Sequence, residues 1–149
     1  MWRLLHSLAE RLGKQESPIL IGDELRAWVN FLKAVEFTIP CQKCRSHYRS
    51  WRIKNRIEKF LIGSSLTIRS EARAWVWGLH SEVNEERRVA NVALSLIPSL
   101  YEKRTPLDIT RDAEECITAF QNAVQQSFLP ADGFRNFKFT LSRLRVLTG

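Results

Sequence analysis

The chain of 149 residues has only three cysteines, too few and too odd in number for the disulfide scaffold of a small secreted protein. No uninterrupted apolar run approaches the length that spans a membrane. Charged residues interrupt the apolar ones in residues 1–13, so this segment does not read as a secretory signal, and Met1-Trp2 is not a myristoylation start. No internal repeat or low-complexity tract is present. These absences predict a soluble intracellular protein with one domain.

The composition is that of an ordinary globular protein, with 44% hydrophobic and 26% charged residues. The length allows a real core without support from disulfides or metals. The balance of 23 basic against 16 acidic residues gives a net charge of +7. This charge favours acidic partners, anionic cofactors or nucleic acid, and a solvated basic surface explains it equally well.

Apolar residues recur with a helical period along most of the chain. The pattern predicts helices over residues 1–13, from Asp23, from Pro40 towards Phe60, from Ser70 as far as Pro98, and over residues 109–124. We therefore predict an all-α fold. Residues 1–96 form a bundle of four main helices, and residues 97–149 form a helical C-terminal extension packed on the same domain.

The basic tail of the chain allows two interpretations. Phe137, Leu141 and Leu144 have the spacing of a final short helix. Phe137, Phe139 and Leu141 also alternate as the residues of a strand do. The helical interpretation agrees with the rest of the chain.

Two thiols, Cys41 and Cys44, lie one helical turn apart just after Pro40, a residue that suits the opening position of a helix. The positive end of that helix, together with Lys43 and Arg45, should lower the pKa of both thiols. Redox chemistry by such a dithiol needs an electron acceptor. Because no protein side chain accepts electrons readily, a bound organic cofactor is the natural inference.

Other uses of a CxxC pair fit less well. A thioredoxin-type motif follows a strand in a βαβ pattern, which is absent, and a c-type haem needs His where Arg45 stands. Zinc is the serious rival, although the chain lacks a second compact ligand pair. Its candidate ligands are Cys41, Cys44 and His47, with Cys116 or His80 as a fourth. Two unbridged buried thiols are a further alternative.

A second polar stripe follows on the helix predicted from Ser70. Trp77, His80 and Asn84 share one face, and Arg87 and Arg88 lie one turn further on. An aromatic ring, an imidazole, a carboxamide and a guanidinium suit a heteroaromatic ring that bears a diphosphate tail. An interfacial histidine beside solvated arginines explains the spacing alone more simply.

The segments Trp2–His6, Pro40–Tyr48 and Trp75–Asn84 in combination resemble the Erv/ALR family of FAD-linked sulfhydryl oxidases. They read Trp-Arg-Leu-Leu-His, Pro-Cys-x-x-Cys-x-x-His-Tyr and Trp-x-Trp-x-Leu-His-x-x-Val-Asn. Their order and approximate spacing agree with the family from Trp2 to about Arg88. The resemblance implies a helical bundle that binds FAD between its helices.

The resemblance also implies roles for single residues. Cys44 would be the sulfur next to the flavin, and Cys41 would exchange with dithiols of protein substrates, whose electrons pass to FAD and then to oxygen. The resemblance implies no metal site. The other residues expected at the cofactor are Trp2, His6, His47, Trp77, His80, Asn84, Arg87 and Arg88. Relatives commonly form homodimers through their first helices. Compact relatives are encoded by large DNA viruses and act in the host cytoplasm or the virion.

The chain departs from the family pattern at several positions. Ser81 replaces a frequent asparagine, no tryptophan follows Trp77 to pack on the adenine, and Cys116 has no partner for a shuttle dithiol. These losses motivate an alternative function, a non-enzymatic virion or assembly protein with the same fold. The predicted third helix is also strongly basic, which raises nucleic-acid binding as another alternative, although a solvated face explains it.

Overall fold

The computed structural model describes residues 1–149, which form helices and no strand. The helices are α1 (Trp2–Ala9), α2 (Pro18–Val35), α3 (Gln42–Lys54), α4 (Ile68–Glu86), α5 (Ile97–Tyr101), α6 (Pro106–Gln125) and α7 (Ala131–Thr148). Short 3₁₀ helices cover Glu36–Thr38, Ile57–Ile62 and Leu94–Leu96. The predicted all-α fold with a helical C-terminal extension is confirmed. None of the helices combines the length and the apolar character that crossing a membrane requires.

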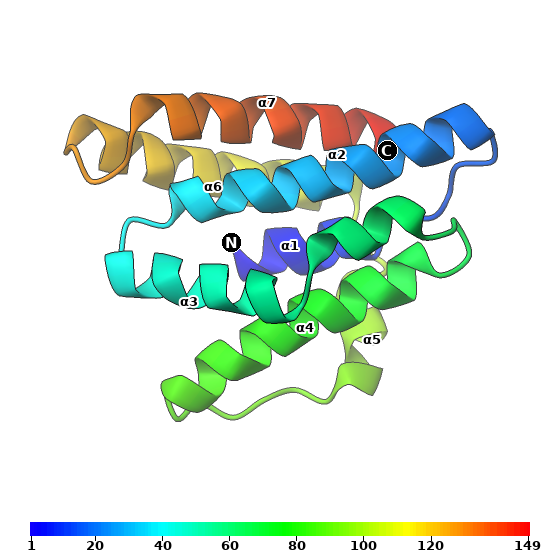
Figure 1. Ribbon diagram of the computed structural model, residues 1–149, viewed down its shortest axis with the longest axis horizontal. Coiled ribbons are helices and arrows are strands. Elements are labelled where there is room, and N and C mark those ends of the chain that lie inside the picture. The colour runs from blue at the N-terminus through cyan, green and yellow to red at the C-terminus, as the bar shows by residue number, and fades with distance from the viewer.

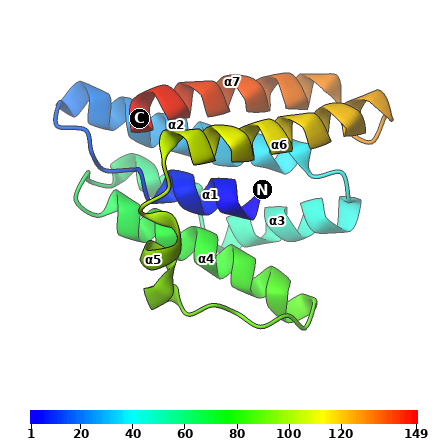
Figure 2. The ribbon, with the colours of Figure 1, turned by 180° about the vertical axis from the view of Figure 1, so that it is seen from behind.

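Helix α1 is the centre of the molecule. It lies between a layer made of α2, α6 and α7 and a second layer made of α3 and α4 (Figures 1 and 2). Leu4, Leu5 and Leu8 are buried as their spacing predicts, and so are His6 and Ser7 on the other side of the same helix. The predicted amphipathic helix is therefore covered on both sides, which places His6 inside the protein.

Several helix boundaries differ from the sequence prediction. Helix α1 ends at Ala9 and does not reach residue 13. Helix α2 begins at Pro18 rather than Asp23, with the proline in the first turn after an extended Ser17, where its missing N–H costs nothing. Helix α3 ends at Lys54 and the chain continues as a 3₁₀ helix, so it does not reach Phe60 as one α-helix.

Helix α4 ends at Glu86, well before Pro98. Arg88 adopts a left-handed conformation with φ of 57°. The backbone N–H of Val89 donates to the Asn84 carbonyl at 2.8 Å, and that of Arg88 donates to the Glu85 carbonyl at 3.1 Å. These two bonds form a Schellman motif, which stops the helix without a glycine.

Helix α7 resolves the ambiguous tail. Phe137, Leu141 and Leu144 are buried, whereas Phe139 is 66% exposed. A strand would place Phe137, Phe139 and Leu141 on one face, so the exposure of Phe139 identifies the helical alternative. At 18 residues α7 is long rather than short, and it packs along α2 (Figure 1).

Candidate functional site

The dithiol lies where α3 begins. Cys41 is the N-cap residue of this helix, with extended backbone angles, and its Sγ accepts a hydrogen bond from the backbone N–H of Cys44 at 3.3 Å. The sulfur thus occupies the place that a serine or aspartate oxygen usually takes at a helix start. Pro40 precedes the cap, so it does not hold the opening position of the helix as predicted. Both thiols are exposed and unbridged in this structure.

The two thiols differ in acidity. Hydrogen bonds from the thiol and the backbone N–H of Cys44 lower the pKa of Cys41. The same thiol contact raises the pKa of Cys44, burial raises it further, and the positive charge of Arg87 opposes the rise. The sequence predicted a lowered pKa for both thiols, which is wrong for Cys44. Arg45 is not among the main causes of either pKa shift. Its guanidinium donates to the Ile39 carbonyl at 2.9 and 3.2 Å.

This asymmetry predicts selective alkylation of the reduced protein. At neutral pH Cys41 has the larger thiolate fraction, so brief treatment with iodoacetamide should modify it before Cys44. Mass spectrometry of the peptide that carries both residues measures the order. The buried Cys116 is an internal reference that should react last. Equal adducts on Cys41 and Cys44 would contradict the asymmetry.

Both thiols border a cavity of about 390 Å³, within the size range of small-molecule sites. Most of its other lining side chains are apolar. They include Trp2 and Leu5 of α1, Val35 of α2, Leu79 and Val83 of α4, and Phe120 of α6. Arg87 also lines this cavity, at the end of α4. Its volume and apolar lining suit a small molecule with an apolar ring, with the two sulfurs at the edge of the space.

A charged cluster connects α3 and α4 beside this cavity. The ring nitrogens of His47 lie 2.9 Å from a Glu86 carboxylate oxygen and 3.1 Å from one of Glu82. The Nζ of Lys43 lies 2.8 Å from the other oxygen of Glu86. Hydrogen bonding to Lys43 and then to His47 lowers the pKa of Glu86. His47, which was predicted to lie at the cofactor, lines the dithiol cavity, and both of its ring nitrogens contact carboxylates.

Four aromatic and imidazole rings connect α1, α4 and α5. Trp2 stacks on His80 with ring centroids 4.2 Å apart, and His6 stacks on Tyr101 at 4.8 Å. The Nε2 of His6 lies 3.1 Å from the Nδ1 of His80. Burial lowers the pKa of His6 to about 4, with a contribution from His80, and burial also lowers that of His80. Both imidazoles are therefore neutral at pH 7 and can share one N–H.

Four other residues predicted at the cofactor lie around a smaller cavity of about 50 Å³. They are His6, Trp77, His80 and Asn84, and Tyr101 lines the cavity with them. The Nε1 of Trp77 donates to the Val92 carbonyl at 2.7 Å. The structure thus divides the predicted cofactor residues between two cavities, and the stacked Trp2 and His80 lie between the two. Arg88 lines neither of these cavities, so only Arg87 of the arginine pair lies at the site.

Close packing fixes α3 against α4. The ring of Trp51 lies where a Cβ on Gly78 would meet it at 2.7 Å, so only glycine allows this approach. The Nε1 of Trp75 donates to the Asn55 carbonyl at 2.7 Å, and the hydroxyl of the buried Tyr48 donates to the Leu32 carbonyl of α2 at 2.6 Å. These contacts set the position of the dithiol relative to the stripe on α4.

The structure bears on two alternatives, a zinc site at the CxxC pair and nucleic-acid binding by the basic helix α3. No three His, Cys, Asp or Glu side chains lie together in a way that would hold a metal ion, and Cys116 is buried in the core. On the basic helix α3, Arg49 and Arg52 both bind Glu36, at 2.5 and 2.7 Å. This part of the basic face is paired within the chain.

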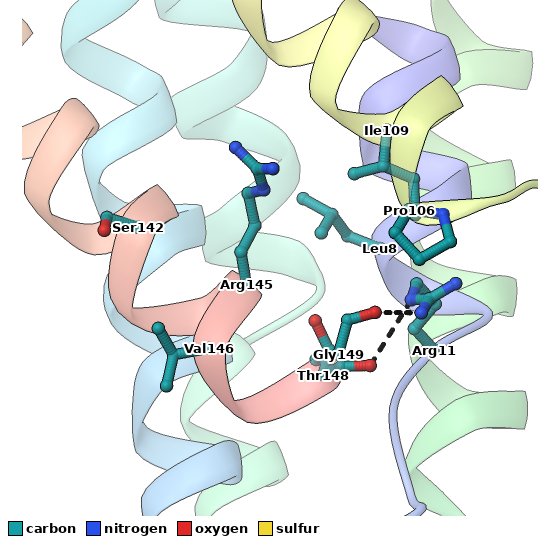
Figure 3. A pocket seen from close by; sticks show the side chains of 9 residues that line it. All are labelled: Leu8, Arg11, Pro106, Ile109, Ser142, Arg145, Val146, Thr148 and Gly149. Atoms are coloured by element: carbon teal, nitrogen blue, oxygen red, sulfur yellow. Dashed lines mark hydrogen bonds between the residues drawn. The ribbon is translucent and has the colours of Figure 1, made fainter.

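A further cavity of about 280 Å³ lies between α1, α6 and α7, away from the dithiol (Figure 3). Arg11 borders it and donates to the carbonyl oxygens of Thr148, at 3.3 Å, and of Gly149. Arg145 of α7 donates to the Thr110 hydroxyl of α6. None of the predicted site residues lies here, and the arginines bind the end of α7 to its neighbours.

These observations define an all-helical protein with a CxxC pair at a helix start, beside an apolar cavity walled by a tryptophan. The model of the Erv1 / Alr family matches residues 1–106, and the chain belongs to this family. No curated protein matches the chain. No solved structure matches it either.

Sequence reasoning missed several residues of the site. Tyr101, Glu86 and Phe120 reach it from segments that the motifs do not cover. Glu82 lies at an unspecified position within the third motif and contacts His47. Glu82 and Glu86 do share a helix face by their spacing, which was a usable signal. Nothing local indicated that His47 would lie between them, because that contact depends on how α3 crosses α4.

Proposed function

We propose that the protein is an FAD-dependent sulfhydryl oxidase, which forms disulfides in protein substrates and passes the electrons to oxygen. The observation that carries this proposal is that the exposed thiols of Cys41 and Cys44 border the apolar cavity walled by Trp2. Family membership supports it, since Erv1 / Alr proteins are generally sulfhydryl oxidases that bind FAD.

The residues present fit a flavin dinucleotide. The flat ring of Trp2 and the apolar walls of the larger cavity suit the flavin ring, and Arg87 supplies a positive charge for a phosphate. The Nδ1 of His6 is buried without a hydrogen-bond partner beside the smaller cavity, where Asn84 offers an amide. A ligand with polar atoms on a heteroaromatic ring would satisfy that nitrogen. When bound, FAD supplies a two-electron acceptor that oxygen reoxidises to give hydrogen peroxide.

The protein's own chemistry is thiol–disulfide exchange. A substrate thiolate attacks the Sγ of Cys41 in a Cys41–Cys44 disulfide, forms a mixed disulfide and releases Cys44 as a thiolate. The positive charge of Arg87 stabilises that thiolate. A second substrate thiolate attacks the substrate sulfur of the mixed disulfide and releases Cys41. The substrate loses two electrons to the pair, and the lowered pKa of Cys41 makes it the better leaving group.

Turnover of a small dithiol tests the proposal. Purified protein supplied with FAD should oxidise dithiothreitol under air and produce one hydrogen peroxide for each disulfide formed. Protein that binds flavin and forms no disulfide would instead support the alternative, an assembly protein that keeps the fold. Protein substrates, a homodimer and a host-cytoplasmic or virion location stay predictions of the resemblance.

A further inference from the structure

The hairpin of α6 and α7 lies beyond residue 106, where the family match ends, yet it shares the core of the bundle. Most of its buried apolar residues belong to the same cluster as those of α1 and α2. They are Ile109, Ala113 and Cys116 of α6 and Phe137, Leu141 and Leu144 of α7. The extension therefore packs as an integral layer of the protein (Figure 2).

Polar contacts attach α6 to the helix that carries Trp2. The side chain of Asp112 is 5% exposed and accepts a hydrogen bond from Arg3 at 3.0 Å. Arg104 binds the other oxygen of the same carboxylate. Because Arg3 follows Trp2 directly, this ion pair fixes the spacing between α6 and the tryptophan that walls the larger cavity.

Phe120 is the residue of α6 that reaches this cavity. It is half-buried, and Phe137 of α7 packs edge-on against it with ring centroids 5.2 Å apart at 84°. Phe137 is fully buried, and its ring centroid lies 5.7 Å from that of Phe31 of α2. The ring of Phe120 is thus held from behind by the core, and one side of it faces the space bordered by Cys41 and Cys44.

We infer that Phe120 is a positioning residue of the cofactor site, and that the C-terminal hairpin supplies through it one wall for the flavin ring. This inference rests on the proposed function. It assigns the hairpin a direct part in holding the cofactor. The wall comes from outside the segment that matches the family.

The test is the rate at which bound FAD dissociates, followed by the recovery of flavin fluorescence on dilution. Phe120→Ala should release FAD about tenfold faster than the parent protein, which is a tenfold weaker Kd at an unchanged association rate. Phe120→Leu keeps apolar volume and should release it more slowly than the alanine variant. Phe128→Ala removes an equal ring from the same hairpin at a site 62% exposed to solvent, and should match the parent.

The outcomes separate the two proposals. Parent-like dissociation from a folded Phe120→Ala variant would overturn the role of Phe120 and leave the oxidase proposal intact. A parent protein that binds no FAD would overturn both. Faster release from Phe120→Ala than from both Phe120→Leu and Phe128→Ala would support the role of Phe120 as part of the cavity wall that holds the flavin.

Discussion

Oxidation of dithiothreitol should stop in both Cys41→Ser and Cys44→Ser. Each replacement removes one sulfur from the exchange, so neither the mixed disulfide nor its resolution can complete a cycle. The two variants should differ in the visible spectrum of the FAD-bound protein. In Cys41→Ser the thiol contact that most raises the pKa of Cys44 is gone, while Arg87 still favours its thiolate. A long-wavelength charge-transfer band should therefore appear in Cys41→Ser and be absent from Cys44→Ser.

Cys116→Ser is the matched control for these variants. Cys116 is 6% exposed in the core of α6, where a thiol acts as a small apolar side chain. Its replacement should leave the rate of dithiol oxidation at the parent level. Normal turnover in Cys41→Ser or Cys44→Ser would remove the pair from the mechanism, and a large loss in Cys116→Ser would add a third sulfur to it.

Phe137→Ala should lower the free energy of unfolding by about 3–5 kcal/mol, the cost of deleting a buried ring from a packed core. Phe137 is fully buried, and its ring contacts Phe31 and Phe120 on two other helices. Urea unfolding followed by circular dichroism measures the change.

Phe139→Ala makes the same chemical change two residues later on α7, at a side chain 66% exposed. It should alter the free energy of unfolding by less than about 0.5 kcal/mol. Similar losses in Phe137→Ala and Phe139→Ala would contradict the helical placement of this segment and its attachment to the bundle.

Periodicity was enough to predict the fold because most helices bury one face. It failed at boundaries where the stop signal is unusual. Helix α4 ends in a Schellman motif with Arg88 in the left-handed position, where a sequence pattern expects glycine. The start of α2 at Pro18 has an ordinary signal in the sequence, because proline suits the first turn of a helix.

The candidate site was predictable where a motif carries it. Spacing on single helices indicated Cys41 and Cys44, and the resemblance added Trp2 and His6. Contacts between helices could not be predicted from the sequence. Sequence spacing could not place Phe120 at the dithiol cavity or His47 between two carboxylates, because both results come from tertiary packing.

The two-cavity arrangement also could not be predicted. Trp77, His80 and Asn84 share a face, and a single pocket is the simplest expectation for such a stripe. In the structure Trp2 stacks on His80, which divides the space into a cavity at the dithiol and a smaller one beside His6. The partner of His80 lies 78 residues away in the chain, so no local pattern records it.

The most direct test is the visible absorption spectrum of the purified protein, recorded without oxygen before and after addition of dithiothreitol. We expect a bound flavin whose absorption near its long-wavelength maximum bleaches on addition of the dithiol and returns when air is admitted. Bleaching should require both Cys41 and Cys44. A protein that takes up no FAD, or whose bound FAD keeps its full absorption in the presence of the dithiol, would contradict the proposed oxidase function.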